Sequence, residues 1–368
     1  MKARIIALIA VSLAAASLAG APTAVGASTT PQRAVIQAVA VKTGLNGPSA
    51  FTFAPGGTIW YLERGTGEVH TLDPGTGLDD LVFTIAGVDG SGERGALGIA
   101  LHPNWPATPR VFVYVTRSHA GRLQNQLVRF TVSGGTGSHL QILLAAPASA
   151  SPYHNGGHIL FGPDRKLYVM IGDGHDSANA QDLSGNLRGK VLRLETDGTA
   201  AHGNPLGRIW SFGHRNSFGF TFDPRTDRLW ETENGPGCTD EINLIAKGAN
   251  FGWGANETCA SAKPGGTNNS GPKPRHLPKA YFASTIGITG AAFCDRCRLG
   301  SQVNGDLLVG DVNTDSIRAI DMNATRTGFS SSPRILLAAP SGVHSIEVSP
   351  SGRIFFSGPT GIYRLATV

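Results

Sequence analysis

A short strand–turn–strand pattern recurs along this chain and constrains its fold more than any other feature. In each copy, apolar and polar residues alternate, a Pro or Gly turn follows, and a second apolar and aromatic run begins a few residues later. Segments of helical period longer than about ten residues are almost absent. The six copies lie at residues 50–61, 99–114, 159–170, 220–230, 290–309 and 345–356.

These copies predict an all-β protein with the architecture of a six-bladed β-propeller. Six copies over the 341 residues that follow residue 27 give about 57 residues each, enough for one four-stranded blade per copy. Six blades that bury their faces against one another close a ring and hide most strand edges. With 49 glycines and only 15% charged residues, the composition suits turns and argues against helical bundles. A β-sandwich or a pair of barrels is the alternative architecture.

The N-terminus has the pattern of a secretory signal. Lys2 and Arg4 precede an apolar stretch over residues 5–18, and small residues then lead to an A-x-A-like cleavage site ending at Ala27. A retained anchor is the alternative, although the apolar stretch is short for a membrane-spanning helix. The expected organisation is a signal peptide over residues 1–27, an N-terminal tail over residues 28–42 that helps to close the ring, and a single propeller domain over residues 43–368.

Export predicts a secreted, extracellular protein with no membrane span after signal removal. Removal of Lys2 and Arg4 lowers the formal charge from +5 to +3, and the other basic residues are scattered, so we do not expect a nucleic-acid partner. A long surface loop is expected over residues 260–278, which are rich in Pro, Gly, Lys and Asn.

Four cysteines suit two disulfides in an oxidising compartment. Three pairings are possible, and closeness in the sequence favours Cys238 with Cys259 and Cys294 with Cys297. The spacing of Cys294 and Cys297 also suits a redox or metal pair.

Polar residues cluster with glycine in three segments that the strand pattern places in loops at an end of the propeller, where binding sites are usually built. The segments are residues 154–158 with 172–174, residues 213–216, and residues 233–236 with 240–243.

His154 is the best candidate for a general base, because imidazole titrates near neutrality and can accept a hydroxyl proton. Asp173 could orient its ring. The alternative is that His154 only satisfies a buried turn. His154 and His158 could also hold zinc, but no third ligand has a diagnostic spacing.

Arg215 and Asn216 suit an anionic or carbonyl-bearing ligand, because a guanidinium group offers a fork of donors. A structural Arg paired with a blade carboxylate is the alternative. Gly235 and Pro236 can present backbone carbonyls to calcium, with carboxylates following at Asp240 and Glu241. A capped tight turn explains the same pattern.

Several longer motifs in the same order resemble the glucose/sorbosone dehydrogenase family over residues 44–365, nearly the whole mature chain. The motifs are residues 95–103, 154–173, 189–194 with 197–198, 213–216, 235–243 and 250–253.

The resemblance implies a six-bladed propeller that uses pyrroloquinoline quinone (PQQ) and calcium to oxidise the anomeric carbon of an aldose sugar to a lactone, with an external electron acceptor. By resemblance, His154 is the catalytic base, Asp173 supports it, and Arg215 and Asn216 contact the quinone. Calcium ligands fall at four positions: the carbonyls of Gly235 and Pro236 at the active-site ion, and Glu241 with the backbone of Phe251 at a structural ion.

The chain also departs from the family pattern at the expected cofactor site. Glu93 stands where the family usually has Gln, and Asn234 where it has Gln or His. A Lys and two Arg that neutralise the carboxylates of PQQ align with Asn313, Gly342 and His344. Without replacement cations, the PQQ site is expected to weaken by several kcal/mol. Two alternatives follow: a non-catalytic, calcium-stabilised propeller that binds a sugar or cell-surface ligand, and a calcium-dependent lactonase.

Overall fold

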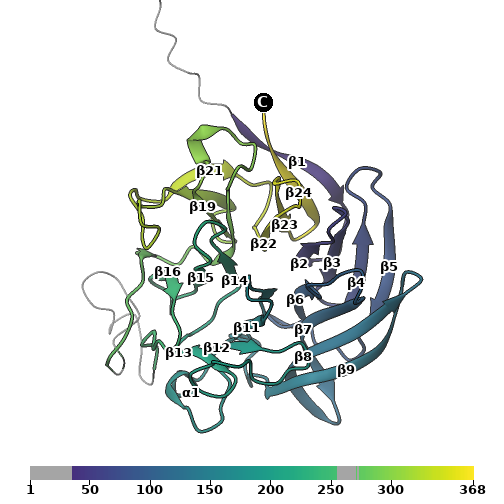
Figure 1. Ribbon diagram of the computed structural model, residues 1–368, viewed down its shortest axis with the longest axis vertical. Coiled ribbons are helices and arrows are strands. Elements are labelled where there is room, and N and C mark those ends of the chain that lie inside the picture. Colours follow the sequence, from purple (N-terminus) through teal and green to yellow (C-terminus); the bar gives the residue numbers. More distant parts are fainter. Residues whose placement is uncertain (1–34, 255–270, 272) are drawn as a thin grey trace, which may run out of the picture. The chain divides into compact units, whose positions relative to one another are not determined.

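The computed structural model describes residues 35–254, 271 and 273–368. In this part of the chain, six antiparallel sheets of four strands each surround a common centre, as Figure 1 shows. The predicted all-β fold and six-bladed β-propeller are therefore confirmed. Short helical turns occur at α1 (Ala178–Gln181) and at the 3₁₀ turn η2 (Ser301–Val303).

The first three sheets follow one another along the chain. Sheet 1 contains β2 (Pro48–Phe53), β3 (Ile59–Glu63), β4 (Glu68–Leu72) and β5 (Asp79–Thr84). Sheet 2 contains β6 (Ala96–Leu101), β7 (Arg110–His119), β8 (Arg122–Ser133) and β9 (Thr136–Pro147). Sheet 3 contains β10 (Ile159–Phe161), β11 (Leu167–Ile171), β12 (Lys190–Leu194) and β13 (Ile209–Phe212).

The remaining sheets complete the ring. Sheet 4 contains β14 (Gly219–Phe222), β15 (Leu229–Glu233), β16 (Asp240–Ile245) and β17 (Ala280–Phe282). Sheet 5 contains β18 (Ile288–Phe293), β19 (Leu307–Asp311), β20 (Ser316–Ile320) and β21 (Arg334–Ala338). Sheet 6 contains β22 (Ser345–Val348), β23 (Ile354–Gly358), β24 (Gly361–Thr367) and β1 (Ile36–Thr43).

Each repeated sequence unit forms the first two strands of one sheet. In sheet 3, for example, Ile159 pairs with Val169 and Phe161 with Leu167 across the turn. Alternation then sends neighbouring side chains to opposite faces. On β7, Val113 belongs to a core cluster shared with sheet 1, whereas Phe112 belongs to a cluster shared with sheet 3. The apolar core is thus divided among the interfaces between consecutive sheets.

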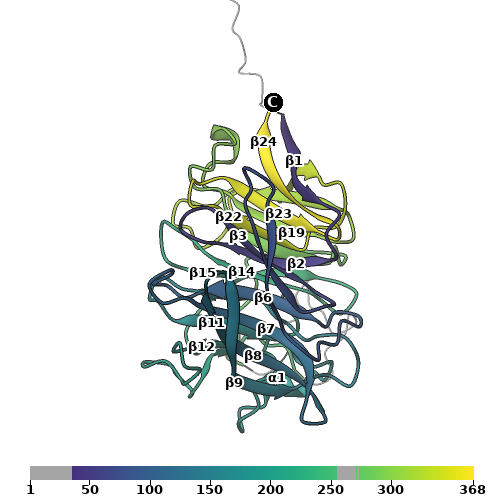
Figure 2. The ribbon, with the colours of Figure 1, turned by 90° about the vertical axis from the view of Figure 1, so that its right-hand side faces the viewer.

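Sheet 6 joins the two ends of the described chain. Strand β1 pairs antiparallel with β24, from Ile36 opposite Thr367 to Thr43 opposite Gly361. The two strands lie side by side in both ribbon views (Figures 1 and 2). This pairing covers an edge of β24 that would otherwise expose unpaired backbone groups. Residues 36–42, expected to form a tail, are therefore part of a sheet.

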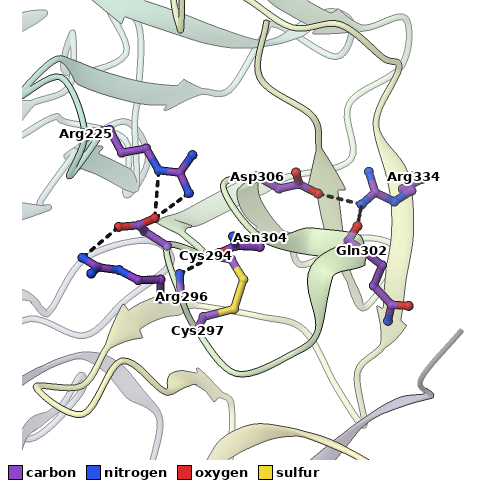
Figure 3. Close-up of a disulfide and its surroundings, with 9 residues drawn as sticks. Arg225, Cys294, Arg296, Cys297, Gln302, Asn304, Asp306 and Arg334 are labelled. Atoms are coloured by element: carbon purple, nitrogen blue, oxygen red, sulfur yellow. Dashed lines mark hydrogen bonds and ion pairs between the residues drawn. A yellow bond between two sulfur atoms is a disulfide. The ribbon is translucent and has the colours of Figure 1, made fainter. Parts of the chain in front are cut away.

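A disulfide joins Cys294 to Cys297 in the turn that follows β18 (Figure 3). This is the pairing favoured by sequence proximity. Next to it, Arg225 in sheet 4 donates to Asp295 in sheet 5 at 2.6 and 2.8 Å, which links the two sheets. Cys238 is also disulfide-bonded. Its expected partner, Cys259, and the expected signal peptide lie outside the described residues.

Antiparallel topology gathers the candidate loops at one end of the ring. In every sheet the first and third strands begin at the same end, where the second and fourth strands finish. The connections between sheets and the turns between second and third strands therefore share that end.

Among the described residues, no helix combines the length and apolar character needed to cross a bilayer.

Replacing Asp223 with Ala should lower the free energy of unfolding by about 3–5 kcal/mol. Asp223 is fully buried and accepts hydrogen bonds from Arg326 Nε at 2.5 Å and Nη2 at 2.8 Å, so the substitution leaves a buried guanidinium without its carboxylate. Urea unfolding measures the loss. The exposed Asp80→Ala variant is the control and should stay within about 0.5 kcal/mol of wild type; equal effects of the two substitutions would refute a structural role for the pair.

Candidate active site

A histidine and a carboxylate form the centre of the site. His154 Nδ1 lies 2.7 Å from Asp173 Oδ1, and both side chains are buried. His154 belongs to the connection between β9 and β10, whereas Asp173 directly follows β11. Because Nδ1 faces Asp173, Nε2 is the ring nitrogen that remains for a ligand in the cavity described below.

The Asp173 carboxylate is fixed by further donors. The backbone N–H of His175 donates to Oδ1 at 2.8 Å, and Trp253 Nε1 donates to Oδ2 at 2.7 Å. The His175 ring also packs edge-on against the His154 ring, with centroids 4.7 Å apart. The Asp173 carboxylate therefore has one well-defined orientation, and its hydrogen bond to Nδ1 fixes the orientation of the His154 ring.

The backbone at His154 has an unusual conformation with φ of +58°. Its N–H donates to Glu93 Oε2 at 2.8 Å, which helps to hold this conformation. A Cβ atom at Gly172 would lie 2.3 Å from the carbonyl oxygen of His154, so only glycine allows β11 to approach so closely. Left-handed backbone at a non-glycine residue is typical of functional sites.

Hydrogen bonds of Glu93 and Asn216 join three inter-sheet segments: those between sheets 1 and 2, 2 and 3, and 3 and 4. Asn216 Nδ2 donates to Glu93 Oε2 at 3.1 Å, and Asn216 Oδ1 accepts the N–H of Gly156 at 3.1 Å. The Glu93 carboxylate thus receives two N–H donors, one from each neighbouring segment. An ionised carboxylate only accepts hydrogen bonds, so Glu suits a position whose two neighbours are both N–H donors.

Arg215 brings a buried positive charge to the same place. Its N–H donates to Glu233 Oε1 at 2.8 Å, its Nη1 donates to the carbonyl of Asn234 at 2.8 Å, and its guanidinium lies 5.4 Å from the Trp253 ring centroid. Burial lowers the pKa of Arg215, and nearby carboxylates oppose that effect. Within the described chain, its buried Nε makes no hydrogen bond.

These side chains face a cavity of about 280 Å³. A second cavity of about 550 Å³ adjoins it and shares four of its wall residues. The shared wall residues are Glu93, Phe218, Thr289 and Val312. The first cavity is also lined by Tyr153, His154, Arg215, Asn216, Asn234, Gly235 and Asn313. Arg64, Ser49 and His344 line the second.

The positions aligned with the family's cations lie around these cavities but carry little charge. Asn313 contributes a neutral amide to the first cavity. In the second, His344 Nδ1 lies 3.3 Å from the carbonyl of Pro48, and burial lowers the pKa of its ring. Gly342 has no side chain, and a Cβ atom there would lie 3.3 Å from Val312. Arg64, on the turn between β3 and β4, supplies a cation that sequence reasoning did not identify.

The expected calcium ligands lie in sheet 4, between β15 and β16, on β16, and between β16 and β17. Gly235 is buried on the cavity wall, and its N–H donates to Asp240 Oδ1 at 2.9 Å. Asp240 Oδ2 accepts the N–H groups of residues 286–288, and burial raises its pKa. This carboxylate therefore orients the turn that carries Gly235 and Pro236. Glu241, on β16, and Phe251, between β16 and β17, are both fully buried.

The structure thus brings the predicted base, its carboxylate, Arg215, Asn216, Glu93 and Asn234 into one network. His158 lies outside it: its ring packs edge-on against Phe220, and burial lowers its pKa to about 4. Sequence reasoning missed Trp253, Tyr153 and Arg64 as site residues. Trp253 stands in a motif that carried the family resemblance, but nothing in the sequence pairs it with Asp173.

A profile of the family described as Glucose / Sorbosone dehydrogenase matches residues 45–361. The chain is 33% identical over 245 residues to quinoprotein glucose dehydrogenase B of Acinetobacter calcoaceticus, covering 58% of this chain and 51% of that protein. It thus spans about half the length of that relative. It is 25% identical over 338 residues to an aldose sugar dehydrogenase of Escherichia coli K12, covering 84% and 86%.

A PQQ-bound aldose sugar dehydrogenase from Streptomyces coelicolor has a similar solved structure. Its TM-score to this chain is 0.76, with 26% identity over 92% of this chain and 99% of that one. The likeness therefore extends around the whole ring.

Trp253→Phe should destabilise the site without removing the aromatic ring beneath Arg215. The variant loses the Nε1 donor to a buried carboxylate, which should cost about 1.5–3 kcal/mol of unfolding free energy. Trp210→Phe, at an indole on β13, is the matched control and should cost less. In NMR spectra, the His154 Nδ1–H signal should broaden in the Trp253 variant alone; an unchanged signal would mean that Trp253 does not fix Asp173.

Proposed function

The chain belongs to the glucose/sorbosone dehydrogenase family, and we propose that it is a secreted, calcium-dependent dehydrogenase that uses PQQ to oxidise the anomeric carbon of an aldose sugar. The observation that carries this proposal is the His154–Asp173 pair on the wall of a cavity that also exposes Arg215. The product would be a lactone, and the electrons would pass to an external acceptor.

The residues around the two cavities can accommodate PQQ if calcium is bound with it. PQQ has three carboxylates, and a desolvated carboxylate needs a partner. Arg64, Arg215 and one calcium ion would supply four positive charges against the three carboxylates of PQQ and that of Glu93, while Asp173, Glu233 and Asp240 also act on Arg215. Calcium would bind at the carbonyls of Gly235 and Pro236, with oxygen ligands of the kind that it prefers.

When bound, the quinone supplies a two-electron acceptor, and calcium makes its carbonyl more electrophilic. The protein's own contribution there is electrostatic. Arg215 is held by Asn234 and Trp253, so its charge is already in place and needs no reorganisation during the reaction. Asn216 is likewise fixed through Glu93 and Gly156.

His154 performs the proton transfer in this proposal. Nε2 accepts the proton of the sugar's anomeric hydroxyl as the hydride leaves its carbon. The imidazolium that forms is stabilised by Asp173, which lies 2.7 Å from Nδ1. Trp253 and the N–H of His175 keep Asp173 in position during this step.

Tyr153 is suited to contact the substrate. It lies on the cavity wall beside its chain neighbour His154, its ring packs edge-on against that of His175, and it is 48% exposed. A sugar presents C–H groups that pack against an aromatic face, while a phenol can hydrogen-bond to its hydroxyls. Tyr153 would thus hold the sugar over His154.

His154→Ala should lower kcat/KM for aldose oxidation by about 10²–10⁴-fold, because it removes the general base. PQQ binding, measured separately by calorimetry, should change little. The exposed His202→Ala variant is the control and should keep wild-type activity. Wild-type turnover in the His154 variant would eliminate His154 as the base.

His344→Arg should tighten PQQ binding by about tenfold, equivalent to ~1.4 kcal/mol, since it restores a cation beside the larger cavity. His202→Arg adds the same charge at an exposed site and controls for long-range electrostatics. Calorimetric titration of the calcium-loaded variants with PQQ provides the comparison. Equal affinities in the two variants would show that the carboxylates of PQQ do not face His344.

A further inference from the structure

A second polar cluster lies between sheets 3 and 4, behind the cavity wall. Glu231 and Glu233 are two residues apart on β15, so their side chains share a face. Asn243 on β16 is the register partner of Glu231 and projects from the same face. His214 reaches the cluster from the connection that follows β13. All four residues are at most 2% exposed.

The cluster converges on one ring nitrogen. His214 Nδ1 lies 3.1 Å from Glu231 Oε2 and 3.1 Å from Glu233 Oε2. The other nitrogen, Nε2, lies 2.8 Å from Ser211 Oγ, which can accept a hydrogen bond from Nε2–H. In that tautomer, the Nδ1 lone pair and two carboxylates point at one another and no donor lies between them.

The same cluster contains buried polar atoms without a hydrogen bond of good geometry within the described chain. They are both oxygens of Glu231, of which Oε2 lies 3.1 Å from His214 Nδ1, and both polar atoms of the Asn243 amide. Glu231 and Asn243 lie close enough for the amide to favour the charged carboxylate, but burial dominates and raises the pKa of Glu231. Unsatisfied buried carboxylate and amide groups are rare in folded proteins and indicate a missing partner.

We propose that His214, Glu231, Glu233 and Asn243 form a buried binding site for a divalent transition-metal cation, zinc or manganese. Ligand atoms about 2.0–2.2 Å from one such ion lie roughly 3–3.5 Å from one another, as the Nδ1–oxygen separations do. The imidazole ligand favours zinc over calcium and magnesium, which prefer oxygen ligands, and the two carboxylates also suit manganese. Ser211 then supplies the outer hydrogen bond that orients a metal-bound histidine.

A proton on His214 Nδ1, in place of a metal ion, is the alternative explanation for the short distances to the two carboxylates. Burial lowers the pKa of His214, but the charges of Glu231 and Glu233 outweigh this and raise it to about 9. One proton can form a directed hydrogen bond to only one carboxylate, and here the bond is made to Glu233. In that state the Glu231 carboxylate and the Asn243 amide lack a hydrogen bond of good geometry, whereas a metal ion would take one oxygen each from Glu231, Glu233 and Asn243 together with His214 Nδ1.

The position of the cluster suggests what the ion does. Glu233 Oε1 accepts the N–H of Arg215 at 2.8 Å, so the same carboxylate that would bind the metal fixes the backbone of the cavity arginine. The metal would therefore be structural and hold the segment that carries Arg215 and Asn216. This inference does not depend on the proposed sugar oxidation.

The test uses the full chain after chelator treatment, returned to a buffer saturated with calcium and titrated with zinc chloride or manganese chloride alone. Calorimetry and elemental analysis should find one tightly bound metal ion per chain in the wild type. In the nearly isosteric Glu231→Gln variant, the affinity for that ion should be at least a hundredfold weaker. His70→Gln is the matched control because Glu63, Glu68 and His70 form another His–Glu–Glu group, which is only half-buried. The Glu231 site should be retained in that variant, and in Glu241→Gln.

Unchanged metal binding by Glu231→Gln would overturn the proposal, as would the absence of any tight zinc or manganese binding by the wild type. A measurement on the wild type keeps the test valid if the variant does not fold. Anomalous diffraction at the zinc edge should give a peak within about 2.2 Å of His214 Nδ1. An anomalous zinc peak found only beside Glu63, Glu68 and His70 would also contradict the proposal.

Discussion

The buried carboxylate of Asp173 is the group on which the candidate site depends. It binds His154 on one side and Trp253 on the other, and a backbone N–H completes its surroundings. His154 comes from the connection between sheets 2 and 3, His175 from the segment between β11 and β12, and Trp253 from the segment between β16 and β17, so the carboxylate joins segments of neighbouring sheets. The interaction is strong because both ends are shielded from water, and removing either donor would leave a buried charge poorly satisfied. The orientation of the base therefore follows from the packing of whole sheets.

A second constraint is the charge around the cavities. The chain places Asn313 and His344 where its family is expected to have cations, and Arg64 reaches the same space from sheet 1. Arg64 Nη1 donates to the carbonyls of Gly90 and Arg94, so this cation is anchored by the connection that also carries Glu93. The positive charge is thus distributed around the ring differently from the expected pattern. In the proposed holoenzyme calcium would become more important, because it would supply the largest local charge.

The repeated strand pairs were predictable because their period of two and their Pro or Gly turns are local signals. The six-bladed ring followed from their number, and His154, Asp173 and Arg215 stood out in Gly-rich loops. The contacts that complete the site were not predictable in the same way. Trp253 lies 80 residues from Asp173 in the sequence, and Arg64 lies 29 residues before Glu93 on a different turn. Glu231 and Asn243 resemble ordinary strand residues until the register places them opposite each other beside His214.

The central claim is that this cavity oxidises sugars with a bound quinone, and one titration tests it most directly. The mature protein, loaded with calcium, is titrated with PQQ while absorbance and heat are recorded, and aldoses are then added. The account predicts saturable binding at micromolar PQQ or below, followed by reduction of the quinone when an aldose is present. Absence of binding at micromolar PQQ would contradict it, and a calcium-stabilised sugar-binding propeller or a calcium-dependent lactonase would then be the better explanation of the same fold.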